Sequence, residues 1–331
     1  MDVSALEWSI TVGVTVAVLL FDVLIVARRP HEPTMRECSA YLAVYVGAAI
    51  AFGAWTWGFH GQDYGIEFYT GWLVEYSLSV DNLFVFIVLM AALNVPRKYQ
   101  QEALMVGIIL ALVFRAIFIA VGYTLVENFS WVFYVFGAFL VYTAVNLVRS
   151  YRSHEEEHPE DNRLVRFAQS HLNVGQEYRG LTLWWKENGV RVVSPMLIVI
   201  LALGATDIMF ALDSIPAIFG ITQEPYLVFT ANVFALMGLR QLYFLLGGLL
   251  KRLVYLSLGL AFILAWIGGK LIIHAMYKGG VIDWEVPTLL SLAVILVTLA
   301  VTAVASLAKS SKEDVEIVAT DSVPPAPAPK D

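Results

Sequence analysis

Long apolar runs alternate with short polar connections over most of the 331 residues of this chain. Each run is close to the roughly 20 residues that an α-helix needs to cross a bilayer. The pattern predicts nine membrane-spanning helices, near residues 8–27, 39–58, 72–94, 103–125, 129–148, 192–221, 226–248, 253–276 and 287–308. The predicted fold class is therefore an all-α polytopic membrane protein.

Polar segments divide these predicted helices into units. We expect two N-terminal spans in 1–70, a three-helix unit in 71–148, a cytoplasmic loop in 149–191, a second three-helix unit in 192–280, a final span in 281–309 and a disordered tail in 310–331. The end of the tail is rich in Pro and Ala, a composition that does not build a packed core.

Basic residues gather in alternate connections between the predicted spans. They are Arg28, Arg29 and Arg36 after the first span, Arg97 and Lys98 after the third, a cluster from Arg149 to Arg191 after the fifth, and Lys251 and Arg252 after the seventh. Connections rich in Lys and Arg remain in the cytoplasm. The N-terminus is therefore predicted outside and the C-terminus inside, with the protein in the plasma membrane.

Composition supports the membrane assignment and narrows the possible partners. The chain is 59% hydrophobic and 15% charged, whereas a soluble domain has roughly 25% charged residues. The net charge of -7 comes without a basic stripe, so nucleic acid is not an expected partner. The one cysteine, Cys38, excludes a disulfide framework and a cysteine-based metal cage. The expected environment is the lipid bilayer, with membrane or secretion partners possible and no resident cofactor.

Two pairs of acidic residues interrupt the apolar runs. Glu75 and Asp81 lie in the third predicted span, and Asp207 and Asp213 lie in the sixth with the same spacing. A carboxylate near the bilayer centre costs at least about 2.5 to 3.5 kcal/mol on insertion scales, so such residues are usually functional. We interpret the four acids as parts of a cation site.

The two pairs also belong to an internal repeat. Glu75 and Asp81 align with Asp207 and Asp213 at a constant offset, and Arg115 and Arg240 each precede a glycine at the same distance. By the charge pattern, the third and sixth spans cross the membrane in opposite directions. The sequence therefore predicts two inverted three-helix repeats, an architecture of secondary transporters that hold their substrate near the midplane.

The residue types near these acids favour oxygen coordination. Asp81 with Asn82, and Asp213 with Ser214, offer two carboxylates and two neutral oxygen donors. Carboxylate, carbonyl and amide oxygens suit Mn²⁺, and the spans lack a central histidine or cysteine for softer metals. Ca²⁺ and Mg²⁺ also take oxygen ligands and stay open as substrates.

Helix geometry separates the members of each acidic pair. Residues six apart lie about 9 Å apart along a regular helix and roughly 120° apart around it. Either the helices are broken, which Pro216 favours in the second pair, or Asp81 and Asp213 bind the metal. In the latter case Glu75 and Asp207 act as gates, proton carriers or ion-pair partners.

Three cations lie within the predicted spans: Arg115, Arg240 and Lys270. Set against the four acids they leave one net negative charge, or two if Asp22 also faces the interior, although Asp22 is better explained as an interfacial acid. A divalent cation would roughly neutralise this centre. We therefore expect ion-pair or gating roles for these residues and competition between metal and protons.

Two stretches carry a resemblance to a known family. The segments SLSVDNLFVF and DIMFALDSIPA resemble the paired signatures of the TerC family, integral membrane proteins named for tellurium resistance, and the similarity covers nearly all nine spans. The resemblance implies a Mn²⁺ exporter that is not an enzyme. It also implies a link to metal supply for exported proteins or to resistance against tellurite.

Two other classes of function compete with transport. An intramembrane aspartyl protease also needs two membrane aspartates, but the sequences SVDN and ALDS do not match the Tyr-Asp and Gly-x-Gly-Asp arrangement of such enzymes. The alternative that stays open is a non-transporting membrane scaffold for the metal or tellurite stress response, or for metalation of exported proteins. A measurement of metal flux separates these possibilities.

Overall fold

The computed structural model describes residues 1–28, 34–153, 174–175, 177–178, 180–187, 190–246 and 255–321. The helices are α1 (Ala5–Arg28), α2 (Met35–His60), α3 (Gln62–Ala92), α4 (Arg97–Asn128), α5 (Val132–Ser153), α7 (Pro195–Phe219), α8 (Pro225–Met237), α9 (Leu239–Leu246), α10 (Leu256–Lys278) and α11 (Thr288–Asp321). The all-α polytopic class is confirmed, because eight helical segments of the described chain are long and apolar enough to cross a membrane. The described apolar part of α1, Ala5–Val18, is shorter.

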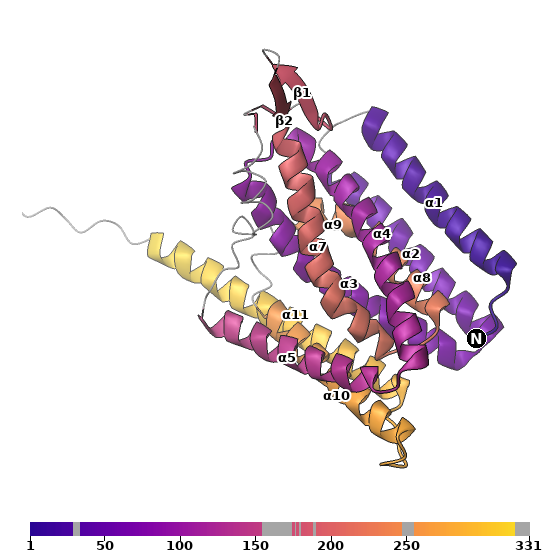
Figure 1. Ribbon diagram of the computed structural model, residues 1–331. Helices are drawn as coiled ribbons and strands as arrows, with labels where there is room; N and C mark the ends of the chain where they lie inside the picture. The colour runs from indigo at the N-terminus through magenta and orange to yellow at the C-terminus, as the bar shows by residue number, and fades with distance from the viewer. Residues whose placement is uncertain are drawn as a thin grey trace, which may run out of the picture.

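A small β-hairpin interrupts the segment that was expected to be only a loop. Strands β1 (Trp184–Glu187) and β2 (Val190–Val193) pair antiparallel, with Trp184 opposite Val193 and Glu187 opposite Val190. Tryptophan and β-branched valine fit the pleated surface of a strand, which explains why this polar connection forms a hairpin. The hairpin leads directly into α7, so it lies at the end of the bundle where α7 begins (Figure 1).

The helices form two groups that cross one another. In the first group α3 packs against α8, and α4 packs against α7. In the second group α5 packs against α10, and α11 packs against α10 as well (Figure 1). The two groups meet where α5 contacts α7 and where α11 contacts α3. The segments predicted as two repeat units are thus interleaved in space.

The helix that opens the first predicted repeat unit starts earlier than its predicted span. α2 begins at a capping box in which Thr34 and Glu37 bond each other's backbone amides. Only Gly61 separates α2 from α3, and its φ of 118° is a value that favours glycine. The boundary at residue 71 therefore falls inside α3, which starts at Gln62. Polar residues such as Asp63 belong to the first turn of α3, where an acid stabilises a helix.

Of the two alternatives for the acidic pairs, the one with broken helices does not hold. α7 is continuous from Pro195 to Phe219, and α3 is continuous through both of its acids. Pro216 lies in the last turn of α7, so the one amide donor that it removes affects only the end of the helix. In the next predicted span a one-residue interruption at Gly238 separates α8 from α9, although Pro225–Leu245 together form one candidate span.

The last helix extends beyond its predicted end. α11 runs from Thr288 to Asp321, whereas the sequence was expected to become disordered from residue 310. The extension contains neither proline nor glycine and includes several good helix formers, such as Lys312 and Glu313. Residues 322–331 of the predicted tail lie outside the described part of the chain.

Candidate functional site

Two apolar clusters pack the bundle, and polar residues lie between them: one cluster lies within the first group of helices, and the other extends to α5, α10 and α11. One cluster contains Leu78, Ile119 and Ala211, and the other contains Leu83, Ala111 and Leu203. The polar residues at and next to this boundary on α3, α4 and α7 form the polar layer: Glu75, Ser79, Asp81, Asn82, Arg115, Thr206 and Asp207. Because Arg115 and Asp207 lie near the middle of α4 and α7, the layer is near the centre of the bundle.

Arg115 connects the two predicted repeat units across this layer. Its Nη1 donates hydrogen bonds to Glu75 Oε2 at 2.5 Å and to Asn232 Oδ1 at 2.7 Å. Its Nη2 lies 3.8 Å from Asp207 Oδ1. The side chains are almost completely enclosed, with relative exposures of 1% for Arg115, 0% for Glu75 and 2% for Asp207. Glu75 and Asp207 are therefore brought to one cation, although they are far apart in the sequence.

The electrostatics of this network follow from burial. Arginine keeps its charge in proteins, and an enclosed charge is strongly destabilising unless opposite charges and hydrogen bonds compensate it. Two carboxylates around one guanidinium provide that compensation. Within the described structure, Glu75 Oε1, Asp207 Oδ2 and the hydroxyls of Ser79 and Ser214 are buried without a hydrogen-bond partner. The network thus retains oxygen atoms that are able to accept a donor or a cation.

Asp81 and Asp213 face different neighbours. Asp81 Oδ1 accepts a hydrogen bond from Ser257 of α10 at 3.4 Å, and Asp213 Oδ1 accepts one from Thr143 of α5 at 3.0 Å. Both aspartates are half-buried and make further interactions. Asp81 and Asp213 are therefore attached to the second group of helices, whereas Glu75 and Asp207 belong to the Arg115 network.

The other predicted site residues are distributed over the bundle. Asn82 and Ser214 are buried beside the two aspartates. Arg240 is buried on α9, directly after the break at Gly238, and Lys270 is buried on α10 beside a separate cavity. Asp22 belongs to α1, but its side chain lies outside the described structure. Among the described residues, no group of three or more His, Cys, Asp or Glu side chains is arranged to hold a metal ion.

Several contributors to the polar core were not among the predicted site residues. Asn232 completes the Arg115 network, and Thr143 and Ser257 supply hydroxyls to the aspartates. A polar residue within an apolar span was the available signal for each of them. Interhelical hydrogen bonding is the common explanation of such residues, and the sequence did not show which helix each one contacts.

These features define a class: a polytopic membrane protein with a charged, enclosed layer near the middle of its helices. The family model described as "Integral membrane protein TerC family" matches residues 60–314. The chain belongs to the TerC family, which confirms the resemblance carried by its two acidic motifs.

Similar proteins come from several bacteria. An uncharacterized membrane protein of Mycobacterium tuberculosis (strain H37Rv) is 44% identical, over 92% of this chain and 80% of its own length. An uncharacterized membrane protein of Myxococcus xanthus is 39% identical, over 92% of each chain. A protein of Escherichia coli (strain K12) with the provisional name membrane-bound redox modulator Alx is 36% identical, over 88% of this chain and 91% of its own. No solved structure matches the chain with significance.

Proposed function

We propose that this protein is a transporter that exports divalent metal cations, Mn²⁺ foremost, from the cytoplasm through the polar layer. The observation that carries the proposal is the enclosed network in which Glu75 and Asp207 share Arg115 between two apolar clusters. Intramembrane ionisable residues of this kind mark ion pathways and proton relays. The four membrane acids have no comparable use in a protein that only assembles partners.

In this proposal Arg115 is a tethered cation that neutralises the layer when no metal is bound. A divalent cation entering the layer takes over one or both carboxylates, and Arg115 then turns toward Asn232, which already accepts one of its hydrogen bonds. Asp81 and Asp213, with Asn82 and Ser214 beside them, provide the hard oxygen ligands that Mn²⁺ prefers. Ca²⁺ and Mg²⁺ are secondary candidates because they take the same ligand type.

The apolar clusters act as the two barriers of an alternating-access cycle. Each cluster closes the route to the polar layer from one end, and opening one while the other stays closed exposes the layer to a single side. The break at Gly238 gives the α8–α9 segment a hinge next to Arg240. Hinge motions commonly use a few residues at the ends of helical elements.

A flux assay in proteoliposomes tests the assignment of the site. We expect Asp81→Asn and Asp213→Asn each to lower Mn²⁺ flux to the background of empty vesicles, because each removes a charged oxygen ligand. Asp283→Asn is the matched control, since it makes the same chemical change on an exposed loop residue and should retain flux. Normal flux in both core variants would defeat the site assignment.

Proton coupling is tested in the same vesicles. If protons and metal compete for the acids of the polar layer, an imposed pH gradient should drive Mn²⁺ movement in the opposite direction to the protons. Flux that ignores the gradient would exclude antiport and leave a uniport mechanism. If the wild-type protein moves no metal at all, the scaffold role for metal stress or exported-protein metalation becomes the better explanation.

A further inference from the structure

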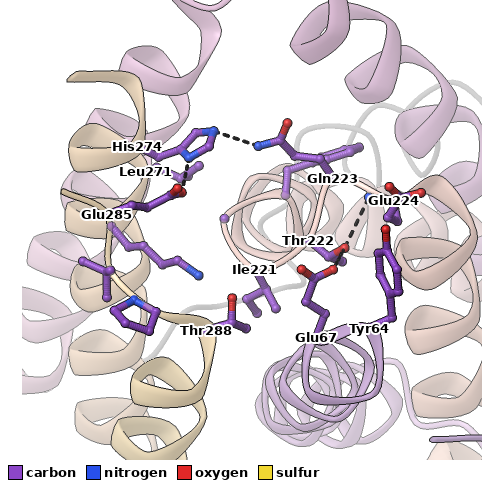
Figure 2. A pocket seen from close by; sticks show the side chains of 15 residues that line it. Tyr64, Glu67, Ile221, Thr222, Gln223, Glu224, Leu271, His274, Glu285 and Thr288 are labelled. Atoms are coloured by element: carbon purple, nitrogen blue, oxygen red, sulfur yellow. Dashed lines mark hydrogen bonds and ion pairs between the residues drawn. The ribbon is translucent and has the colours of Figure 1, made fainter. Parts of the chain in front are cut away.

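A second polar site lies away from the Arg115 network, at the end of the bundle where α7 stops. A cavity of about 450 Å³ opens there between the start of α3, the α7–α8 turn, the end of α10 and the start of α11 (Figure 2). Its charged and polar lining includes Glu67, Gln223, Glu224, Lys270, His274 and Glu285. By the proposed orientation, this end of the bundle faces the outside.

Lys270 is the feature of the cavity that calls for explanation. Its side chain lines the cavity and is only 7% exposed. Within the described part of the chain it has neither a hydrogen bond nor an ion pair within 4.0 Å, and it interacts at longer range with Glu285 and Glu67. A buried ammonium group normally has a direct partner. Here the space between the amine and the two carboxylates is left to solvent or to a ligand.

The carboxylates of the cavity keep oxygen atoms available. Glu67 accepts a hydrogen bond from Thr222 at 2.6 Å through Oε2 only, so its Oε1 is not used by a described residue. Figure 2 shows Glu67 projecting from α3 toward the α7–α8 turn, with His274 and Glu285 on the other side of the cavity. A ligand in this space therefore meets negative charge from two sides.

His274 is held by hydrogen bonds at both of its ring nitrogens. Lys278 donates to Gln223 Oε1 at 3.2 Å, so the Gln223 amide nitrogen must donate to His274 Nε2, at 2.8 Å. Nδ1 of His274 then carries the proton and donates it to Glu285. Histidines that bind metals through one nitrogen typically donate from the other to a carboxylate in this way. The Nε2 lone pair would be freed by a rotation of the Gln223 side chain.

We propose that this cavity is a low-affinity binding site for a hydrated divalent cation, contacted by Glu67 and by His274 Nε2, with Lys270 as a fixed competing charge. The proposal rests on the export function proposed above and gives the cation a last binding site before it leaves. A conduction pathway needs binding that is weak enough for release. The Lys270 ammonium weakens cation binding by repulsion, so that the cation leaves the cavity readily.

The experiment measures Mn²⁺ binding and requires no transport. Purified protein in nanodiscs, with Asp81→Asn and Asp213→Asn to weaken the central site, is titrated with Mn²⁺ while the electron paramagnetic resonance signal of free Mn²⁺ is followed. Glu67→Gln and His274→Gln should each weaken the remaining site. Lys270→Met should tighten it by about tenfold, because a unit charge at several ångströms from the cation is removed. Lys270→Arg keeps the charge and should change the affinity little.

Two further variants keep the result interpretable. If Lys270→Met does not fold, Lys270→Gln removes the same charge and retains a polar group. Asp283→Asn controls for a general loss of negative charge, because Asp283 lies on the same connection as Glu285 but does not line the cavity. Titrations of Glu67→Gln and His274→Gln that superimpose on the parent, or neutral variants at Lys270 that bind no tighter, would overturn the proposal.

The flux assay and the binding assay test the export function and the cavity site separately. Wild-type vesicles that move no Mn²⁺, together with a site that responds to Glu67 and Lys270, would refute export while leaving the cavity site in place. Normal flux with no response at the cavity would refute the cavity site alone.

Discussion

At the scale of single residues, Arg115 decides how the membrane acids are used. Its guanidinium has several donors in a planar fork, which allows one side chain to contact Glu75, Asn232 and Asp207 together. Lysine has only a compact ammonium group and could not keep the same three contacts. The arginine is therefore an organising element of the polar layer, whether or not a metal is bound.

We expect Arg115→Gln to lower the free energy of unfolding by about 3–5 kcal/mol, because it leaves two buried carboxylates without their cation. The double variant Arg115→Gln with Glu75→Gln should recover part of this loss, since it removes one uncompensated acid. Unfolding in mixed micelles by increasing dodecyl sulfate measures both. Arg97→Gln is the control, because Arg97 is exposed. Equal stability of the Arg115 and Arg97 variants would contradict the proposed role.

At the scale of elements, the contact between α5 and α10 depends on two glycines that face each other. A Cβ atom on Gly137 would lie 2.7 Å from the Gly268 carbonyl oxygen, and one on Gly268 would lie 2.8 Å from the Gly137 carbonyl oxygen. Small residues at such crossings allow helices in a membrane to pack closely. The close approach places Thr143 and Ser257, on these same helices, within reach of Asp213 and Asp81.

Adjacent glycines on α10 provide a sharp test of this packing. Gly268→Ala should lower the free energy of unfolding by about 1–3 kcal/mol, because the new methyl group forces the helices apart. Gly269→Ala should be neutral or slightly stabilising, since nothing lies within 4 Å of a Cβ atom there. Thermal unfolding in detergent compares the two. If both variants unfold alike, the close crossing does not control stability.

At the scale of the whole molecule, the packing of helices agrees with an exchange of two units. In this exchange α3 corresponds to α7, α4 to α8 and α5 to α10. The α3–α8 contact then corresponds to the α4–α7 contact, and the α5–α10 contact corresponds to itself. Corresponding acids, Glu75 and Asp207, meet at Arg115 between the units. An inverted repeat stays a prediction, and this arrangement of contacts supports it.

The orientation of the molecule is testable by labelling of single cysteines. With Cys38→Ser as background, we expect Asp283→Cys to react with a membrane-impermeant maleimide in intact cells. Lys186→Cys, on the exposed side of the hairpin at the other end of α7, should react only after the cells are opened. The reverse pattern would place the N-terminus inside and the Glu67 cavity on the cytoplasmic side.

The sequence by itself determined the fold class, the family and most of the spans. Apolar runs of membrane length must form helices, because backbone groups in hydrocarbon find partners only within the segment. The same reasoning identified Glu75, Asp81, Asp207 and Asp213, since acids in such runs are costly. Helix ends were less certain, as at Gln62 and Asp321, because polar residues continue a helix as readily as they end it.

Only the tertiary structure decided which polar groups meet. Arg115 and Asp207 are far apart in the chain, and their pairing depends on how α4 packs against α7. Local sequence fixes which residues a helix carries, but the contacts between helices fix the partners of each side chain. The Arg115 network and the Glu67 cavity could therefore be found only in three dimensions.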